Sequence, residues 1–301
     1  MALRITRAAD PIKVERLNVT IYAAPGLGKT SLAFTADAPL LLDFDSGAHR
    51  AVNRKDAVRV TDWSDVAGIT AEDLAPFKTV IVDTAGRALD VLTPDIIRAN
   101  PKHGRGGALT LQGYGELKTR FTAFLKLLNS FGKDVVLLAH MDEQRSGDDV
   151  LERLDMQGGS KNEVFKASDA MGRIVLQNGQ RRLLFSPTDA AFGKNPGQLP
   201  PLDIPHMTDA NFDGFLGRVI QQTKDALNAQ TEAQKEAADE QAWFRSVLPG
   251  IDDADGINEL LDRAKKAGKA TSKLVADRAK ALGLAFDKAS GAYVERIQDA
   301  A

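Results

Sequence analysis

The chain of 301 residues is 43% hydrophobic and 27% charged, as in an ordinary globular protein of about two domains. It has no cysteine, which excludes disulfides, thiol nucleophiles and thiolate metal sites. Lys and Arg number 39 against 41 Asp and Glu, so the net charge of −2 excludes a global basic field, and any nucleic-acid contact must come from local basic loops. The N-terminus has no signal-peptide core and no apolar run approaches the ~18 residues of a membrane span, which together indicate a cytoplasmic protein without a membrane partner.

Short apolar runs separated by helix-like stretches fill the first two thirds of the chain. Buried strands are predicted at Leu17–Tyr22, Pro39–Phe44, Thr79–Val82 and Val135–Ala139, and an amphipathic helix at Glu116–Phe131. Buried strands that alternate with helices predict an α/β fold with a mainly parallel central sheet. Farther on, Asn178-Gly179 between two apolar runs predicts a hairpin, so the sheet is expected to end in an antiparallel edge.

The last third of the sequence has a helical pattern. Thr208 is expected to cap a helix that runs to about Gln222. Residues 223–242 are rich in Ala, Glu, Gln and Lys, which predicts a helical connector, and residues 243–301 carry two amphipathic patterns around Gly268. We therefore expect a core of residues 1–222, a connector of residues 223–242 and a small α-helical C-terminal module of residues 243–301.

The most informative segment follows the first predicted strand and precedes a predicted helix, at residues 23–30 (AAPGLGKT). A phosphate-binding loop needs glycines so that backbone N–H groups can curl around a phosphate, a lysine for the phosphate oxygens, and a hydroxyl for Mg²⁺. Ala23 stands where the pattern has glycine, which is acceptable if its φ is negative; the alternative is a surface Gly-Lys turn. The predicted nucleotide contacts are Pro25, Gly26, Leu27, Gly28, Lys29, Thr30 and Ser31.

Polar side chains follow three of the predicted strands. Asp83 ends an apolar strand, as a Mg²⁺-binding carboxylate requires, and Asp45 is placed to polarise an attacking water as a general base. The alternative for Asp43 and Asp45 is that both merely terminate their strand. His140 ends the strand at Val135–Ala139, where it would contact a γ-phosphate and report hydrolysis, or serve as a structural histidine.

Four elements in this order resemble the RecA-like ATPases, and more closely the phage-type AAA nucleotide-binding proteins, among which are RecA-related single-strand annealing proteins. The resemblance covers roughly residues 15–220. Its more specific motifs are DFDSG at 43–47, VDT at 82–84, LLAH at 137–140 and FGKNPG at 192–197.

The resemblance implies a RecA-like P-loop core that binds ATP and Mg²⁺ and assembles as a homo-oligomer, ring or filament, with ATP between subunits. Lys29 and Thr30 would bind phosphate and Mg²⁺, Asp83 would be a magnesium carboxylate, and Asp45 would be the catalytic carboxylate. His140 would be the polar switch, and Lys194 would reach the γ-phosphate of a neighbouring subunit. Two positions depart from the pattern: Asp45 is shorter than the usual glutamate, and Pro196 stands where an arginine is common.

The resemblance also implies DNA contacts on two loops after the third and fourth strands. In the first, residues 100–107, the basic residues are Lys102, His103 and Arg105. In the second, residues 144–165, they include Arg145 and Lys161, diluted by acidic neighbours. The alternative for each is an ordinary solvated loop.

We therefore expect an ATP-dependent protein of phage recombination or annealing that binds single-stranded DNA, in the cytoplasm of a bacterial host if phage-encoded. One alternative is a helicase or helicase-loading ATPase. Another is a non-hydrolysing nucleotide switch that scaffolds partners. The tail is expected to bind a partner such as single-strand-binding protein, to mediate self-association or to cap the core.

Overall fold

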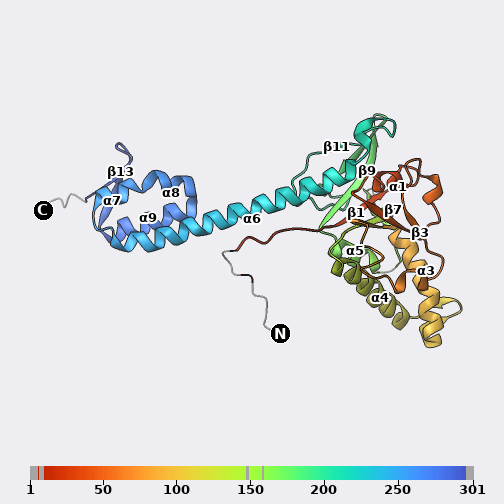
Figure 1. Ribbon diagram of the computed structural model, residues 1–301. Coiled ribbons are helices and arrows are strands. Elements are labelled where there is room, and N and C mark those ends of the chain that lie inside the picture. Colours follow the sequence, from red (N-terminus) through yellow and green to blue (C-terminus); the bar gives the residue numbers. More distant parts are fainter. Residues whose placement is uncertain (1–5, 7–9, 147–148, 158, 296–301) are drawn as a thin grey trace. The chain divides into compact units, whose positions relative to one another are not determined.

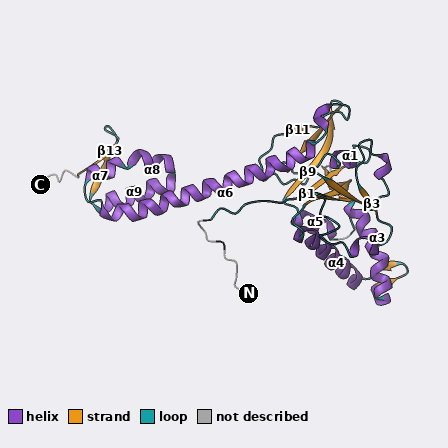
Figure 2. Cartoon of the chain, in the orientation of Figure 1, coloured by secondary structure: helices purple, strands orange, loops and turns teal. Residues whose placement is uncertain are grey.

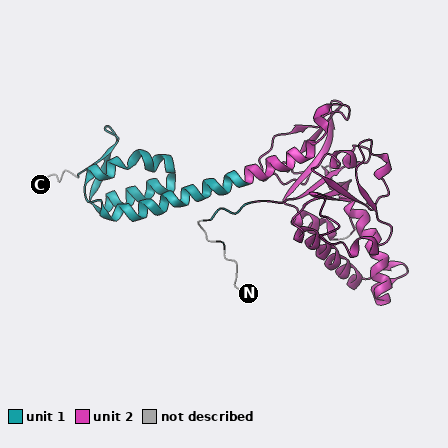
Figure 3. Cartoon of the chain, in the orientation of Figure 1, with its two compact units in different colours: residues 1–13, 228–301 teal, residues 14–227 magenta. Residues whose placement is uncertain are grey.

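The computed structural model describes residue 6 and residues 10–146, 149–157 and 159–295 (Figure 1). The first residues of the predicted core and the last residues of the predicted C-terminal module therefore lie outside the described residues. Two compact units are distinguished, residues 14–227 and a smaller one of residues 1–13 and 228–301 (Figure 3).

A sheet forms the centre of the larger unit (Figure 2). It has nine strands, in the order β11-β10-β9-β1-β7-β4-β2-β3, with β8 paired to β7. Pairing is parallel from β9 through β1, β7, β4 and β2 to β3, and antiparallel in the pairs β9–β10, β10–β11 and β7–β8. The α/β prediction of a mainly parallel sheet with an antiparallel edge is thus confirmed. The strands are β1 (Asn18–Ala23), β2 (Pro39–Asp43), β3 (Ala57–Arg59), β4 (Thr79–Asp83), β7 (Asp134–Ser146), β8 (Asp149–Leu154), β9 (Ala170–Gln177), β10 (Gln180–Leu184) and β11 (Leu202–Asp203).

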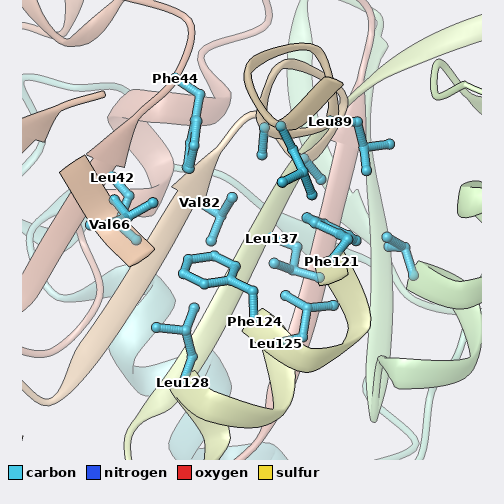
Figure 4. Close-up of a cluster of buried hydrophobic side chains, with 14 of the residues drawn as sticks. Leu42, Phe44, Val66, Val82, Leu89, Phe121, Phe124, Leu125, Leu128 and Leu137 are labelled. Atoms are coloured by element: carbon cyan, nitrogen blue, oxygen red, sulfur yellow. The ribbon is translucent and has the colours of Figure 1, made fainter. Parts of the chain in front are cut away.

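The central strands are buried on both faces. Along β4, Val80 and Val82 belong to one apolar cluster and Ile81 to the other, as the two-residue period of a strand requires. Figure 4 shows the first cluster, in which Phe121 and Phe124 of a helix meet side chains of the sheet. The helices of the larger unit are α1 (Lys29–Ala33), α2 (Ser64–Ala67), α3 (Ala85–Ala99), α4 (Leu111–Ser130) and α5 (Ser160–Ala167).

The turn between β9 and β10 is the predicted Asn-Gly turn. Asn178 and Gly179 have φ of 51° and 77°, and a two-residue hairpin loop of this type needs positive φ at both positions. Gln177 and Gln180 pair directly across it. The predicted hairpin is confirmed.

The helix that Thr208 was expected to cap begins later, and that prediction is wrong. Asp209 caps a short 3₁₀ helix (Ala210–Phe212), and the chain then turns at Gly214, whose φ is +68°, before α6 (Phe215–Val247) begins. The N–H of Leu216 donates to the hydroxyl of Thr35, which anchors the start of α6. Both expected boundaries, at residues 222 and 242, fall inside this one continuous helix.

The smaller unit has its own apolar cluster, around Phe244, Ile257 and Val275. It contains the end of α6, followed by α7 (Ala254–Glu259), α8 (Leu261–Ala267) and α9 (Lys269–Ala281). A hairpin of β12 (Leu284–Asp287) and β13 (Ala292–Glu295) follows, which the sequence did not predict. Across the residues described in both units, no helix has the length and apolar character needed to cross a membrane.

Candidate nucleotide-binding site

The predicted phosphate loop joins β1 to α1. Gly26 and Gly28 have φ of +81° and +80°, a left-handed conformation that glycine adopts without steric cost, so the chain can turn tightly before α1 begins at Lys29. The ammonium of Lys29 donates to the carbonyl oxygens of Ala23 and Ala24 at 3.1 and 3.2 Å. Ala23 is the last residue of the extended strand β1, so its methyl group fits where the usual pattern has glycine.

Thr30 of α1 and Asp83 of β4 meet, although β1, which leads into α1, is not a neighbour of β4 in the sheet. The strand β7 lies between β1 and β4, and the carboxyl ends of all three lie at one edge of the parallel sheet. The hydroxyl of Thr30 donates to Oδ2 of Asp83 at 2.6 Å. Burial raises the pKa of Asp83 to about 6, with smaller contributions from Asp45 and Asp43, and the Thr30 hydrogen bond opposes this shift.

These two side chains fit Mg²⁺. A hydroxyl and a carboxylate are the hard oxygen donors that this ion takes, and the buried carboxylate of Asp83 has its charge disfavoured in a way that a cation would reverse. Among the described residues, no group of three or more His, Asp or Glu could hold a metal alone. That suits Mg²⁺, which binds through one or two protein ligands together with substrate phosphates and water.

The two aspartates after β2 have different surroundings. Asp43 is buried, and its carboxylate accepts hydrogen bonds from the backbone N–H groups of Gly47 and Ala48, so it terminates the strand, as the structural alternative predicted. The carboxylate of Asp45 instead forms ion pairs with Arg50 at 3.0 Å and Arg87 at 3.5 Å. Asp45 is therefore held in place by two arginine side chains.

A cavity of about 430 Å³ gathers the predicted residues. Its walls come from the phosphate loop, the start of α1, the segment after β2, the end of β4, and β7. The lining residues are Pro25, Gly26, Gly28, Lys29, Thr30, Ser31, Asp45, Gly47, Arg50, Ala51, Asp83 and His140. Leu27 of the predicted set does not line it.

His140 lies beside the phosphate loop because it pairs with Ala23 in the register of β7 and β1. Burial, reinforced by the positive charge of Lys29, lowers the pKa of His140 from its ordinary 6.5, so the ring is neutral at pH 7. Its buried Nδ1 has no hydrogen-bond partner among the described residues. The ring thus carries an unused polar atom at the cavity.

Three arginines at or beside the site were missed from the sequence. Arg50 ends a short 3₁₀ helix after β2 and lines the cavity, and Arg87 lies in the first turn of α3. Their nearness to DFDSG and VDT was the available signal. Arg181 comes from β10, and its guanidinium donates to the carbonyl of Leu27 at 3.3 Å, while a Cβ at Gly28 would lie 2.5 Å from its Nη1. Only the tertiary fold reveals that contact.

Lys194 is not brought to this cavity within the chain. Its ammonium donates to the carbonyl of Ser168 at 2.7 Å and lies 4.6 Å from the centre of the Phe165 ring. Burial lowers its pKa. A role toward a neighbouring subunit stays a prediction.

The two segments expected to bind DNA form hairpins in place of open loops. Arg105 lies in the hairpin of β5 (Gly104–Arg105) and β6 (Ala108–Leu109), and Lys102 precedes that hairpin; both side chains are exposed. The ring of His103 contacts the side-chain amide of Asn100 at 3.1 Å. In the second segment, exposed Arg145 lies near the end of β7, which pairs with β8, and Lys161 is half-buried in α5. Residues 147, 148 and 158 of that segment lie outside the described residues.

The family model described as AAA domain matches residues 15–196. The chain belongs to this family. With the phosphate loop and the Thr30–Asp83 pair in place, it is a P-loop ATPase of the AAA domain family, and the P-loop core that the sequence resemblance implied is confirmed. Among curated proteins, none matches the sequence.

Several solved structures resemble parts of the chain. A prototypical ATPase from the type III secretion system of pathogenic bacteria shares 12% identity at a TM-score of 0.33, over 53% of this chain and 51% of its own, so the alignment spans about half of that protein. A KaiC-like protein from the archaeon Pyrococcus horikoshii OT3 shares 10% at 0.35, over 64% and 87%. The flagellar accessory protein FlaH from Methanocaldococcus jannaschii shares 9% at 0.31, over 56% and 76%.

Proposed function

We propose that this AAA domain protein hydrolyses ATP to ADP and phosphate in the cavity at the phosphate loop, and that the bound nucleotide controls its grip on single-stranded DNA. The observation that carries the first part is the convergence of Lys29, Thr30, Asp83 and Asp45 on one cavity from three different strand ends. Burial lowers the pKa of Lys29 and raises the pKa of Asp83, so both charges are disfavoured. Such perturbed groups in one cavity are typical of a functional site.

Each residue has a distinct task in the reaction. The phosphate-loop N–H groups and Lys29 bind the β- and γ-phosphates, and Thr30 and Asp83 would hold Mg²⁺, which would neutralise phosphate charge. Asp45 accepts a proton from the water whose oxygen attacks the γ-phosphorus, while the bond from that phosphorus to the bridging oxygen breaks and ADP leaves. Because Asp45 is paired with Arg50 and Arg87, a γ-phosphate that attracts either guanidinium frees the carboxylate for this role.

The exposed basic residues of the two hairpins support single-stranded DNA as the partner. Lys102 and Arg105 are exposed next to glycines that allow close approach of a sugar–phosphate backbone, and Arg145 is exposed near the end of β7. His140 lies on the same strand as Arg145, so a contact between His140 and a γ-phosphate would act on the strand that leads into the second hairpin. A role in recombination or annealing of phage DNA, with subunits assembled around ATP, follows from the sequence resemblance.

The decisive experiment measures phosphate release with and without single-stranded DNA, together with DNA binding by anisotropy with and without ATP. Wild-type protein should release phosphate and bind DNA more tightly with ATP. Asp45→Asn should reduce turnover about a hundredfold while leaving nucleotide binding intact, and Lys29→Ala should abolish binding. Lys55→Ala, which changes a lysine that does not line the cavity, is the control.

Different outcomes separate the alternatives. ATP binding without phosphate release would support the non-hydrolysing switch, and hydrolysis-driven strand displacement would support a helicase. Equal DNA binding with and without ATP, or none, would sink the DNA-binding part, whereas unchanged ATP affinity in Lys29→Ala would refute the nucleotide site.

A further inference from the structure

The smaller unit contains a groove of about 610 Å³ that is separate from the nucleotide site. Its lining residues come from α8, α9 and the β12–β13 hairpin, and some of them also belong to the apolar cluster of this unit. Its lining includes Leu261, Lys265, Lys269, Lys273, Phe286 and Tyr293.

The floor of the groove is mainly apolar. Leu261 and Ala276 contribute aliphatic surface, and Phe286 remains 47% exposed although its ring meets Tyr293 edge to face at a centroid distance of 5.1 Å. The backbone of Tyr293 exchanges two hydrogen bonds with the side-chain amide of Asn258 in α7, which fixes the hairpin wall. A preformed apolar recess of this kind fits side chains of a ligand.

The rim of the groove is positively charged. Lys269 and Lys273 lie four residues apart in α9 and therefore project from one side of that helix, and Lys265 precedes them in α8. Among the described residues, Lys269 and Lys273 have no carboxylate within ion-pair distance, and Lys265 meets only Asp262, at 3.7 Å. Arg263, by contrast, is bound to Glu240 and lies over the Trp243 ring. Within the part of the chain that the structure describes, these three cations thus face the groove without a close carboxylate partner.

We propose that this groove binds an acidic peptide segment of another protein that carries a large apolar side chain. The apolar side chain fills the recess beside Phe286, and the flanking carboxylates meet Lys265, Lys269 and Lys273. A peptide fits better than single-stranded nucleic acid, because the apolar lining is largely aliphatic and its two aromatic rings pack against each other, whereas binding of a single strand relies on successive bases stacked on separate aromatic platforms. This surface would recruit a partner without help from the nucleotide site.

The test uses full-length protein and a short fluorescein-labelled peptide in which aspartates flank a Leu-Phe pair, with anisotropy as the readout. The double substitution Lys269→Glu/Lys273→Glu should weaken binding about tenfold or more, because two attractions become repulsions. Lys280→Glu/Lys288→Glu makes the same change of charge at exposed positions in the same unit that do not line the groove, and should leave binding within about twofold. Lys29→Ala should also bind the peptide normally, which separates this result from the ATPase proposal.

Two further arms test the apolar part and the rival occupant. Phe286→Ala removes an exposed ring, so the fold should persist while peptide affinity falls, and a peptide with serines in place of Leu-Phe should bind as weakly. Equal affinity of wild type and Lys269→Glu/Lys273→Glu for the peptide would overturn the proposal. So would single-stranded DNA that displaces the peptide and itself loses affinity in that variant.

Discussion

Asp45 lies between two arginines, and the two differ in their access to a ligand. Arg50 lines the cavity, whereas Arg87 approaches the opposite carboxylate oxygen from α3 and also pairs with Asp90 at 3.0 Å. A guanidinium is a suitable donor for a phosphate whose charge grows in the transition state. The loop at residues 192–197 lacks the usual arginine, because Pro196 stands at that position. We expect Arg50 to supply the positive charge from within the same chain.

Arg50→Ala should reduce phosphate release about tenfold to a hundredfold with little change in ADP affinity, since ADP lacks the γ-phosphate. Arg50→Lys should recover part of the rate. Phosphate release under saturating ATP and titration with fluorescent ADP give the two readouts. Arg54→Ala, an exposed arginine outside the cavity, is the control, and a wild-type rate in Arg50→Ala would contradict the assignment.

His140 makes folding stability depend on pH. Its folded-state pKa is lowered below the ordinary 6.5 by burial, so the unfolded chain takes up a proton at higher pH than the folded chain does. Its stabilising contribution is therefore complete above pH 6.5 and is lost as pH falls toward the folded-state pKa. Thermal unfolding should show wild type losing stability on acidification faster than His140→Gln. Parallel curves for the two proteins would show that the ring keeps an ordinary pKa.

At the scale of elements, the antiparallel hairpin β9–β10 supports the phosphate loop. Arg181 donates to the carbonyls of Leu27 and Pro205, at 3.3 Å each, and its guanidinium covers the side of Gly28 where another residue would place Cβ. The loop is thus fixed from outside by a strand that lies 154 residues away from it in sequence.

Arg181→Ala should weaken ATP binding about fivefold, because the loop loses one of its outer contacts, and should cost only about 1 kcal/mol of stability. The neighbouring Arg182, whose exposed side chain pairs with Asp203, gives the matched control Arg182→Ala. Nucleotide titration and denaturant unfolding measure the two effects. Loss of ATP affinity in Arg182→Ala equal to that in Arg181→Ala would point to a general effect on the hairpin.

Local sequence patterns predicted the elements whose residues carry the signal themselves. Continuous apolar runs marked β1, β2 and β4, and the glycines with Lys29 marked the phosphate loop. The end of β7 was missed because only Met141 of this part packs against an apolar cluster, whereas residues 142–146 are polar and pair only with β8. Arg181 was missed for a related reason: its contact exists only after β9 and β10 have joined the sheet beside β1.

At the scale of the molecule, the continuous helix α6 takes part in two separate cores. Leu216, Val219 and Ile220 pack in the apolar cluster that also contains residues of α1. Phe244, near the end of α6, and Leu248, directly after it, belong to the cluster of the smaller unit. The residues between are mostly exposed. Sequence composition predicted the exposed middle as a separate connector. Its residues favour a helix, however, so α6 continues through it without a break.

A chain ending after Leu227 should fold and bind ATP like the full protein. It keeps every residue of the cavity, the half-buried Lys224–Asp134 ion pair at 2.7 Å, and the part of α6 that packs in the larger core. Fluorescent ATP titration should give an affinity within about twofold, and Lys29→Ala in the shortened chain should abolish it. Phosphate release without DNA should also persist, because all the residues that line the cavity lie within the larger unit. A shortened chain that folds, as judged by circular dichroism, but binds no ATP would show that the smaller unit is needed to complete the site.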